Sequence, residues 1–234
     1  MSALFDNFLM RGIAKILEIL GLSLLWLFLC IPVVTAGAST TALYYSVQKT
    51  VKNNRGYALR GFFTAFKDNF KQSTIVWLFF LVWLGILGYD FYMMYSFYLI
   101  GEPMGKYLVV VYLLTLLVVA WSLYVFPYIA RFENTTKEVF KNTFMIAVAN
   151  APTTIISSGW FIMYGYIIYR WTVAIIFMPV IYNLIKSAFI EKIFRKYLTT
   201  EQIEREQELN GVIYNDDQPI GLLAKLKKKK EADE

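Results

Sequence analysis

The polar side chains with the most regular spacing lie between residues 41 and 52. Thr41, Tyr45, Gln48 and Lys52 follow one another at intervals of four, three and four residues. On an α-helix this spacing places all of them on one face. Because lipid does not tolerate a polar stripe, we expect this one to face other helices or a wet cavity. The stripe either forms part of a substrate or peptide site or supplies hydrogen bonds between helices.

Two pairs of ionisable residues are further candidates. Asp90 lies 17 residues beyond Ser73, which corresponds to about 26 Å along a helix. Arg170 lies in a predicted turn on the same outer side and could pair with Asp90. A charged group within a membrane is a functional hypothesis by default, with a structural ion pair or exposure to water as the alternatives. Glu18 lies one helical turn from Lys15, so we expect these two to form an ion pair at the inner interface.

The amino-acid composition of the chain excludes most catalytic chemistry. The chain has no histidine, the usual general base and metal ligand, and one cysteine, Cys30. Structural zinc sites need several Cys or His ligands, and a single Cys forms no disulfide within the chain. The sequence also lacks an HExxH motif, a nucleophile elbow and a Gly-rich phosphate loop. We therefore expect no catalytic, metal-binding or cofactor-binding residues, and predict that the protein is not an enzyme.

The elements that position these residues are predicted to lie in a membrane. Of the 234 residues, 58% are hydrophobic and 17% are charged, whereas soluble domains average about 45–50% apolar and 25% charged residues. A membrane span needs about 20 apolar residues. Four stretches meet this length, and a fifth is interrupted by Asn150 and Pro152; the five cover residues 16–34, 73–99, 107–130, 171–190 and 143–168.

The basic residues predict the topology. They cluster within residues 49–71, within 131–141 and from 186 onward, and cytoplasmic loops collect Lys and Arg. If both termini are cytoplasmic, the segment Ala36–Val51 must cross back or form a re-entrant helix, which makes six membrane helices. The alternative is five helices with the N-terminus outside. The basic start, the first apolar run and Ala36-Gly37-Ala38 imitate a signal peptide, but the run is long for one, so we expect it to be retained.

Two amphipathic segments are predicted to connect the spans. Gly56–Lys71 places Phe62 and Phe66 on one helical face and Arg60 and Lys67 on the other, the pattern of a helix lying in the membrane interface. Glu133–Val148 partly repeats this spacing before another apolar stretch. We predict an all-α integral membrane protein with three helical hairpins joined by amphipathic interfacial elbow helices. The alternative is that two ordinary loops happen to be amphipathic.

The C-terminal segment differs from the rest of the chain. After Leu198 the sequence becomes polar and highly charged, so we predict a polytopic membrane domain over residues 1–198 and a cytoplasmic charged tail over residues 199–234. A short apolar and basic segment near its end either contacts anionic headgroups or stays solvated.

Two motifs resemble those of a known family. Ile31–Tyr45 reads IPVVTAGASTTALYY and Phe63–Gln72 reads FTAFKDNFKQ. With these motifs, about residues 1–200 resemble the YesL family of bacterial membrane proteins, a domain family of unknown function. The resemblance implies a multi-pass inner-membrane protein of Gram-positive-type bacteria, often encoded beside carbohydrate-utilisation and sugar ABC-transport genes. It implies no established activity and no catalytic residues.

Two functions follow as expectations. The first is a non-enzymatic accessory membrane protein of carbohydrate uptake or utilisation, whose partners are the lipid bilayer and sugar ABC transporter subunits. The second is a small stand-alone transporter or channel for a small solute, lined by the polar stripe, Asp90 and Asn150. We expect no nucleic-acid partner, because cytoplasmic topology accounts for the basic residues and the net charge of +6.

Overall fold

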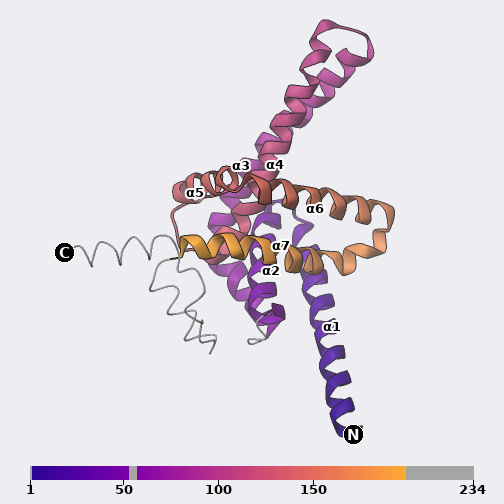
Figure 1. Cartoon of the computed structure of the whole chain (residues 1–234), viewed down its shortest axis with the longest axis vertical. Helices are drawn as coiled ribbons and strands as arrows, with labels where there is room; N and C mark the ends of the chain where they lie inside the picture. The colour runs from indigo at the N-terminus through magenta and orange to yellow at the C-terminus, as the bar shows by residue number, and fades with distance from the viewer. Residues whose placement is uncertain (1, 53–56, 199–234) are drawn as a thin grey trace, which may run out of the picture. The chain divides into compact units, whose positions relative to one another are not determined.

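The computed structural model describes the backbone of residues 2–52 and 57–198 and the side chains of residues 15–49 and 57–198. These residues form helices and no β-strand (Figure 1), which confirms the predicted all-α class. The chain divides into two compact units, Met1–Leu184 and Ile185–Glu234. The predicted tail, residues 199–234, and the side chain of Lys52 lie outside the described residues.

The first unit contains six α-helices and the start of a seventh, with shorter helical segments between them. Their bounds are α1 Ser2–Cys30, η1 Val33–Thr35, α2 Ala36–Ser46, η2 Val47–Lys52, α3 Ala58–Leu99, η3 Pro103–Tyr107, α4 Leu108–Arg131, α5 Thr136–Ala149, α6 Ala151–Arg170, η4 Thr172–Ile176 and α7 Met178–Phe194. The described part of the second unit comprises the C-terminal part of α7 and η5, Arg195–Tyr197.

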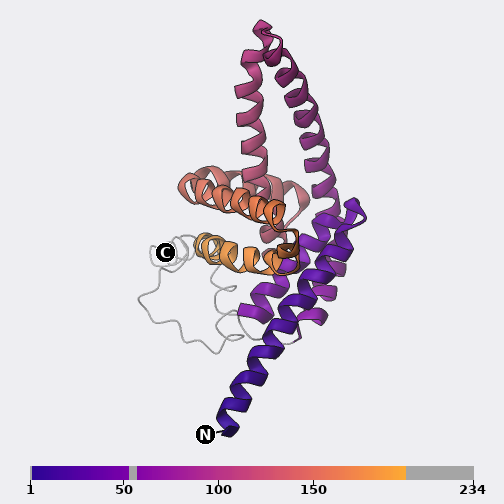
Figure 2. The same cartoon turned by 90° about the vertical axis from the view of Figure 1, so that its right-hand side faces the viewer.

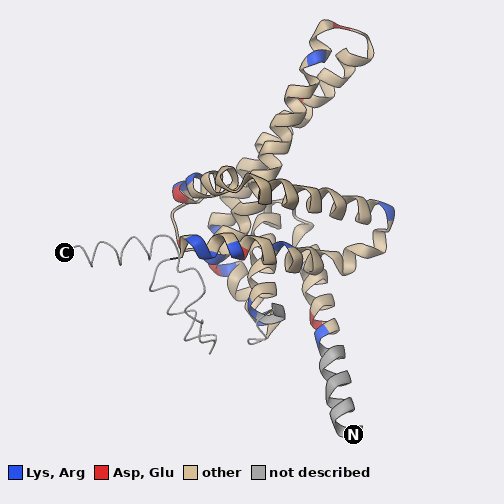
Figure 3. Ribbon diagram, in the orientation of Figure 1, with Lys and Arg blue, Asp and Glu red and all other residues tan. Residues whose placement is uncertain are grey.

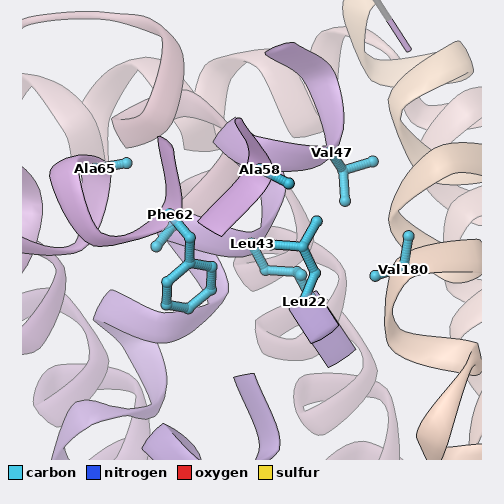
Figure 4. Packing of buried hydrophobic residues seen from close by; sticks show 8 residues of the cluster. Leu22, Leu43, Val47, Ala58, Phe62, Ala65 and Val180 are labelled. Carbon is cyan, nitrogen blue, oxygen red and sulfur yellow. The ribbon is translucent and has the colours of Figure 1, made fainter. Parts of the chain in front are cut away.

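The core of the first unit lies where α1, α2 and the first turns of α3 meet (Figure 4). Leu22 and Phe62 are fully buried, and small side chains such as Ala42, Ala58 and Ala65 line the contact. Small residues let helix backbones approach closely, which is how helices associate in membranes. This packing holds the polar residues of α2 against α3.

Helix α3 is longer than predicted. It runs for 42 residues without a break, about 63 Å, roughly twice the thickness of a bilayer hydrocarbon core. The predicted elbow and the predicted span are therefore parts of one helix, since no residue between them interrupts it. Near its start, the backbone N–H of Ala58 donates to Oε1 of Glu18 (3.4 Å). Further along, Trp77 Nε1 donates to the carbonyl of Val33 in η1 (2.7 Å), so the N-terminal half of α3 contacts both α1 and η1.

The C-terminal half of α3 pairs with α4 as a hairpin that extends beyond the other helices of the first unit (Figure 2). The turn contains Gly101 with φ +76°, a left-handed conformation that glycine adopts freely. It also contains Gly105, where a Cβ atom would lie 2.5 Å from Cα of Tyr98. Large apolar side chains on both helices are exposed, including Val82 and Leu113, each 58% exposed.

The predicted break at Asn150 and Pro152 is confirmed. α5 ends at Ala149, α6 begins at Ala151, and the two helices are bent by 98°. The break falls at Asn150 (φ −115°, ψ 41°), and Pro152 lies in the first turn of α6, where its missing N–H costs no helical hydrogen bond. Inside one continuous helix the same proline would remove a hydrogen bond and clash with the preceding turn. The second predicted elbow is thus a separate helix, whereas the first is not.

The structure identifies two or three candidate spans among the described residues and does not confirm six. Among the described residues, Ala58–Leu99 and Pro103–Arg131 are long and apolar enough to cross a membrane, and the bent α5–α6 pair gives a third span if it counts as one. α2 has only 11 residues, about 16 Å, and is too short to cross alone. The described part of the structure supports two or three spans in an all-α protein.

Candidate functional site

The first member of the polar stripe, Thr41, lies between α2 and α3. Its side chain is 0% exposed, and its Oγ1 lies 2.9 Å from Oγ of Ser73 and donates to the carbonyl of Gly37 (3.1 Å). Gly37 itself is pressed against α3 and α4, because a Cβ atom there would lie 2.7 Å from the carbonyl oxygen of Ser73. At this position the stripe supplies a hydrogen bond between helices.

The rest of the stripe has a different environment. Tyr45 is half-buried, and its hydroxyl accepts a hydrogen bond from Nζ of Lys49 (3.1 Å), which also lies 5.2 Å from the centre of the ring. Gln48 and Lys52 fall in η2, a π-helical segment. Because a π-helix has a wider turn than an α-helix, residues 45, 48 and 52 do not keep the alignment that the α-helical spacing predicts.

The side-chain oxygen of Gln48 is buried and accepts no hydrogen bond from the described residues. A buried polar atom of this kind usually has a partner. π-helical segments are frequent at functional sites. The stripe therefore divides into a packed part at Thr41 and a part at Gln48 that retains hydrogen-bonding capacity.

A second group of polar side chains, which the sequence did not reveal, joins α4 to the α5–α6 bend. Tyr124 is fully buried, and its hydroxyl oxygen lies 3.0 Å from Oγ1 of Thr154. The Thr154 hydroxyl also bonds the carbonyls of Ala147 (2.8 Å) and Asn150 (3.1 Å). The Ala147 carbonyl lies in the last turn of α5, where carbonyls lack helical partners, whereas the Asn150 carbonyl also accepts the backbone N–H of Thr154 (3.0 Å). Thr154 thus stabilises the bend that the Asn150–Pro152 signal predicts.

The start of α5 is held to the end of α4 by amide groups. The hydroxyl of Tyr128 accepts hydrogen bonds from Nδ2 of Asn134 (2.8 Å) and Nδ2 of Asn142 (2.9 Å). Gln72 on α3 donates to the carbonyl of Asn134 (2.6 Å). Three segments that are distant in sequence therefore meet at this junction. Single amides in polar connecting sequence give no pattern from which such contacts could be predicted.

The N-terminus of α5 carries a capping box. The carboxylate of Glu138 accepts hydrogen bonds from the backbone N–H and the hydroxyl of Thr135 (2.8 Å each). The hydroxyl oxygen of Thr135 accepts a bond from the Glu138 N–H in return (3.4 Å). The Thr135 backbone N–H, followed by its hydroxyl, lowers the pKa of the Glu138 carboxyl below its ordinary value. This reciprocal cap stabilises the first turn of α5.

The two predicted ion pairs have different outcomes. Lys15 Nζ lies 3.6 Å from Oε2 of Glu18, which confirms that pair. No ion pair joins Asp90 to Arg170 in the described part of the chain. Asp90 is half-buried on the outer half of α3, whereas Arg170 is exposed at the end of α6. The structure therefore does not bring these two residues together.

Ligands for a metal ion are not gathered anywhere in the described residues. No group of three or more His, Cys, Asp or Glu side chains that could hold a metal is found there. Cys30, at the end of α1, is partly buried. The polar groups that the fold does bring together are hydroxyls, amides and indole N–H groups, which hold helices to one another.

Comparison with known proteins adds a family match over part of the chain. Residues 19–91 match a family described as "Protein of unknown function, DUF624". The matched segment contains the C-terminal part of α1, all of α2 and most of α3, and with them the polar stripe and the Gly37 contact. No curated protein and no solved structure matches the chain. The similarity to this family is thus confined to the N-terminal helices.

Proposed function

We propose that the protein is a non-enzymatic integral membrane protein that binds another membrane protein as an accessory component of carbohydrate uptake or utilisation. The YesL resemblance supports this class of partner and identifies sugar ABC transporter subunits as candidates. The match to a family of unknown function over residues 19–91 is compatible with it.

One feature of the α3–α4 hairpin carries the proposal. Gly85 and Gly88 lie on the exposed surface of α3, and a Cβ atom at either position would meet no other atom within 4 Å. Between membrane helices, glycines allow two backbones to approach closely and pack well. The hairpin therefore presents a shallow backbone surface that no described helix of this chain covers and that suits a helix of a partner.

The membrane arrangement proposed with this function has six helices, with both termini in the cytoplasm of a bacterial cell. The placement of Lys and Arg supports it. A cysteine placed at Gly101 and a tag on the N-terminus test it in whole cells. Labelling of the cysteine from outside and protection of the tag are expected, and an N-terminal tag that is exposed outside the cell would overturn the six-helix arrangement.

Affinity purification from a mild detergent tests the function. Wild-type protein should recover transporter subunits in stoichiometric amount. The double variant Gly85→Leu/Gly88→Leu, which fills the exposed surface, should recover much less while melting at the wild-type temperature. Gly159→Leu, also at a glycine with no atom within 4 Å, is the matched control on α6. Isolation of a self-contained oligomer that moves solute in liposomes would reject the accessory function in favour of a stand-alone transporter.

A further inference from the structure

Within the first unit, most of the described lysines and arginines lie at one end of the α3–α4 hairpin, and the projecting part of the hairpin carries few charges (Figure 3). Five cationic side chains at that end are exposed: Arg60, Lys67 and Lys71 on α3 and Lys137 and Lys141 on α5. We call these five residues the basic collar. Two facts, the position of the collar along the helices and the side chains beside it, indicate what it contacts.

The position follows from helix geometry. Lys71 and Leu99 are separated by 28 residues of unbroken α3, about 42 Å. A bilayer is about 30 Å thick in its hydrocarbon core and about 40–45 Å thick including headgroups. When the outer half of α3 crosses the membrane, Lys71 therefore lies at the level of the inner headgroups.

α5 lies at the same level. Gln72, next to Lys71, donates to the carbonyl of Asn134 (2.6 Å). Asn134 is followed by α5, whose first half is tied to α4 through Asn142 and Tyr128 (2.9 Å). Lys137 and Lys141 therefore start from the same end of the hairpin as Lys71.

Exposed apolar side chains accompany the cations on both helices. On α3 the cationic residues occupy one stripe, and Leu59, Phe63 and Phe70 form an exposed stripe immediately beside it. A third face, including Phe62, is buried in the core. On α5 the exposed side chains change from Lys137 and Lys141 to large apolar residues toward the C-terminus, namely Phe144, Met145 and Val148.

Three acidic residues lie in the same region, Asp68, Glu133 and Glu138, and are exposed. The five cations outnumber them, and the Glu138 carboxylate is occupied by the cap at Thr135. Lysine clusters directly at the cytoplasmic end of a membrane helix attract anionic lipid, and long side chains can extend to the phosphates while their stems cover apolar surface.

We propose that the basic collar binds the phosphate groups of anionic phospholipids in the inner leaflet. The exposed apolar stripe favours a lipid surface over a soluble acidic protein, because it continues directly into the membrane-crossing part of α3. The inference rests on the proposed membrane placement and is independent of the proposed transporter partner.

Native mass spectrometry of the full-length protein, released from mixed micelles with equal amounts of phosphatidylglycerol and phosphatidylcholine, tests this proposal. The wild type should retain phosphatidylglycerol at least about tenfold over phosphatidylcholine, since each cation near the surface favours anionic lipid by about fivefold before screening. The variant Lys67→Gln/Lys71→Gln/Lys137→Gln/Lys141→Gln should lose most of this preference, because only Arg60 of the collar remains and one cation favours anionic lipid by at most about fivefold. Lys106→Gln/Arg170→Gln, which removes cations outside the collar, should keep the wild-type preference.

A second measurement uses only the wild type, in case the fourfold variant folds poorly. Raising the salt concentration should weaken phosphatidylglycerol retention and leave phosphatidylcholine retention unchanged. An undiminished preference in the fourfold variant, or an equal loss in the control, would overturn the proposal. So would displacement of the lipid by polyglutamate at an equal concentration of charge, which indicates a soluble acidic partner. All of these measurements use the protein without a transporter, so their failure is distinct from failure to recover transporter subunits.

Discussion

Replacing Gly37 by alanine should disturb the closest contact between α2 and the α3–α4 pair. The added Cβ atom would lie 2.5 Å from Cβ of Trp77, 2.7 Å from the carbonyl oxygen of Ser73 and 3.1 Å from Cε1 of Phe126. Non-bonded carbon atoms prefer separations of about 3.5–4.0 Å. Two of these three atoms belong to the backbone or to the base of a side chain, so they cannot rotate away. α2 must therefore move by about 1 Å.

The cost has two parts. Inserting a methyl group into a well-packed site costs about 1–3 kcal/mol. The displacement would also lengthen the bond between Thr41 and Ser73, now 2.9 Å, and a hydrogen bond of this kind contributes about 0.5–1.5 kcal/mol. Alanine is the better helix former by about 1 kcal/mol, which offsets part of the loss. We expect a net destabilisation of about 1–3 kcal/mol, a decrease in melting temperature of roughly 3–10 °C for a chain of this size.

Thermal unfolding in a mild detergent, followed by circular dichroism, measures this effect. Gly85→Ala is the control, because a Cβ atom there meets nothing within 4 Å and the substitution gains helix propensity without a clash. It should melt at or slightly above the wild-type temperature. If Gly37→Ala melts as high as Gly85→Ala, the close approach of α2 to α3 is absent and the reasoning is wrong.

Three further predictions concern other contacts. Thr154→Val should destabilise the protein by about 1–3 kcal/mol and Tyr124→Phe by about 1 kcal/mol, because Thr154→Val removes both the hydroxyl partner of buried Tyr124 and the bond to the Ala147 carbonyl, whereas Tyr124→Phe removes one bond. Chemical unfolding that ranks the two variants in the opposite order would contradict this assignment. Because the pKa of Glu138 is lowered, the cap stabilises α5 while the Glu138 carboxylate is ionised, and this stabilisation is lost as the pH falls through the lowered pKa. The melting temperature of Glu138→Gln should therefore decrease less in acid than that of the wild type. Equal acid dependence in both proteins would count against the cap. Gly105→Ala should lower the melting temperature, because its Cβ would lie 2.5 Å from Cα of Tyr98; a variant that melts like the wild type would show that the outer turn is looser than described.

Much of the local structure could be predicted from single residues and short patterns. The composition predicted an all-α membrane-type protein, and Pro152 predicted a break that the structure shows as the 98° bend. The spacing of Lys15 and Glu18 predicted their ion pair. Each of these depends on residues close together in the chain, for which helix geometry alone is sufficient.

The features that could not be predicted depend on the relative rotation and depth of different helices. The predicted pairing of Asp90 with Arg170 rests only on their similar depth in the membrane. Depth does not determine the direction in which each side chain points around its helix axis. Thr154 and Tyr124 lie in apolar runs where a single hydroxyl has no distinguishing pattern. The elbow before Ser73 was separated from the span because its residue pattern changes, although the backbone continues as one helix.

The unbroken α3 has a mechanical consequence. A straight helix resists bending because bending stretches its backbone hydrogen bonds, so α3 responds to a change in bilayer thickness mainly by tilting as a rod. A tilt of 10° about its midpoint would move each end by about 5 Å. The N-terminal end of α3 lies against α1 and α2 at Ala58 and Phe62. A change in the tilt of α3 would therefore displace side chains in the packed core around Leu22.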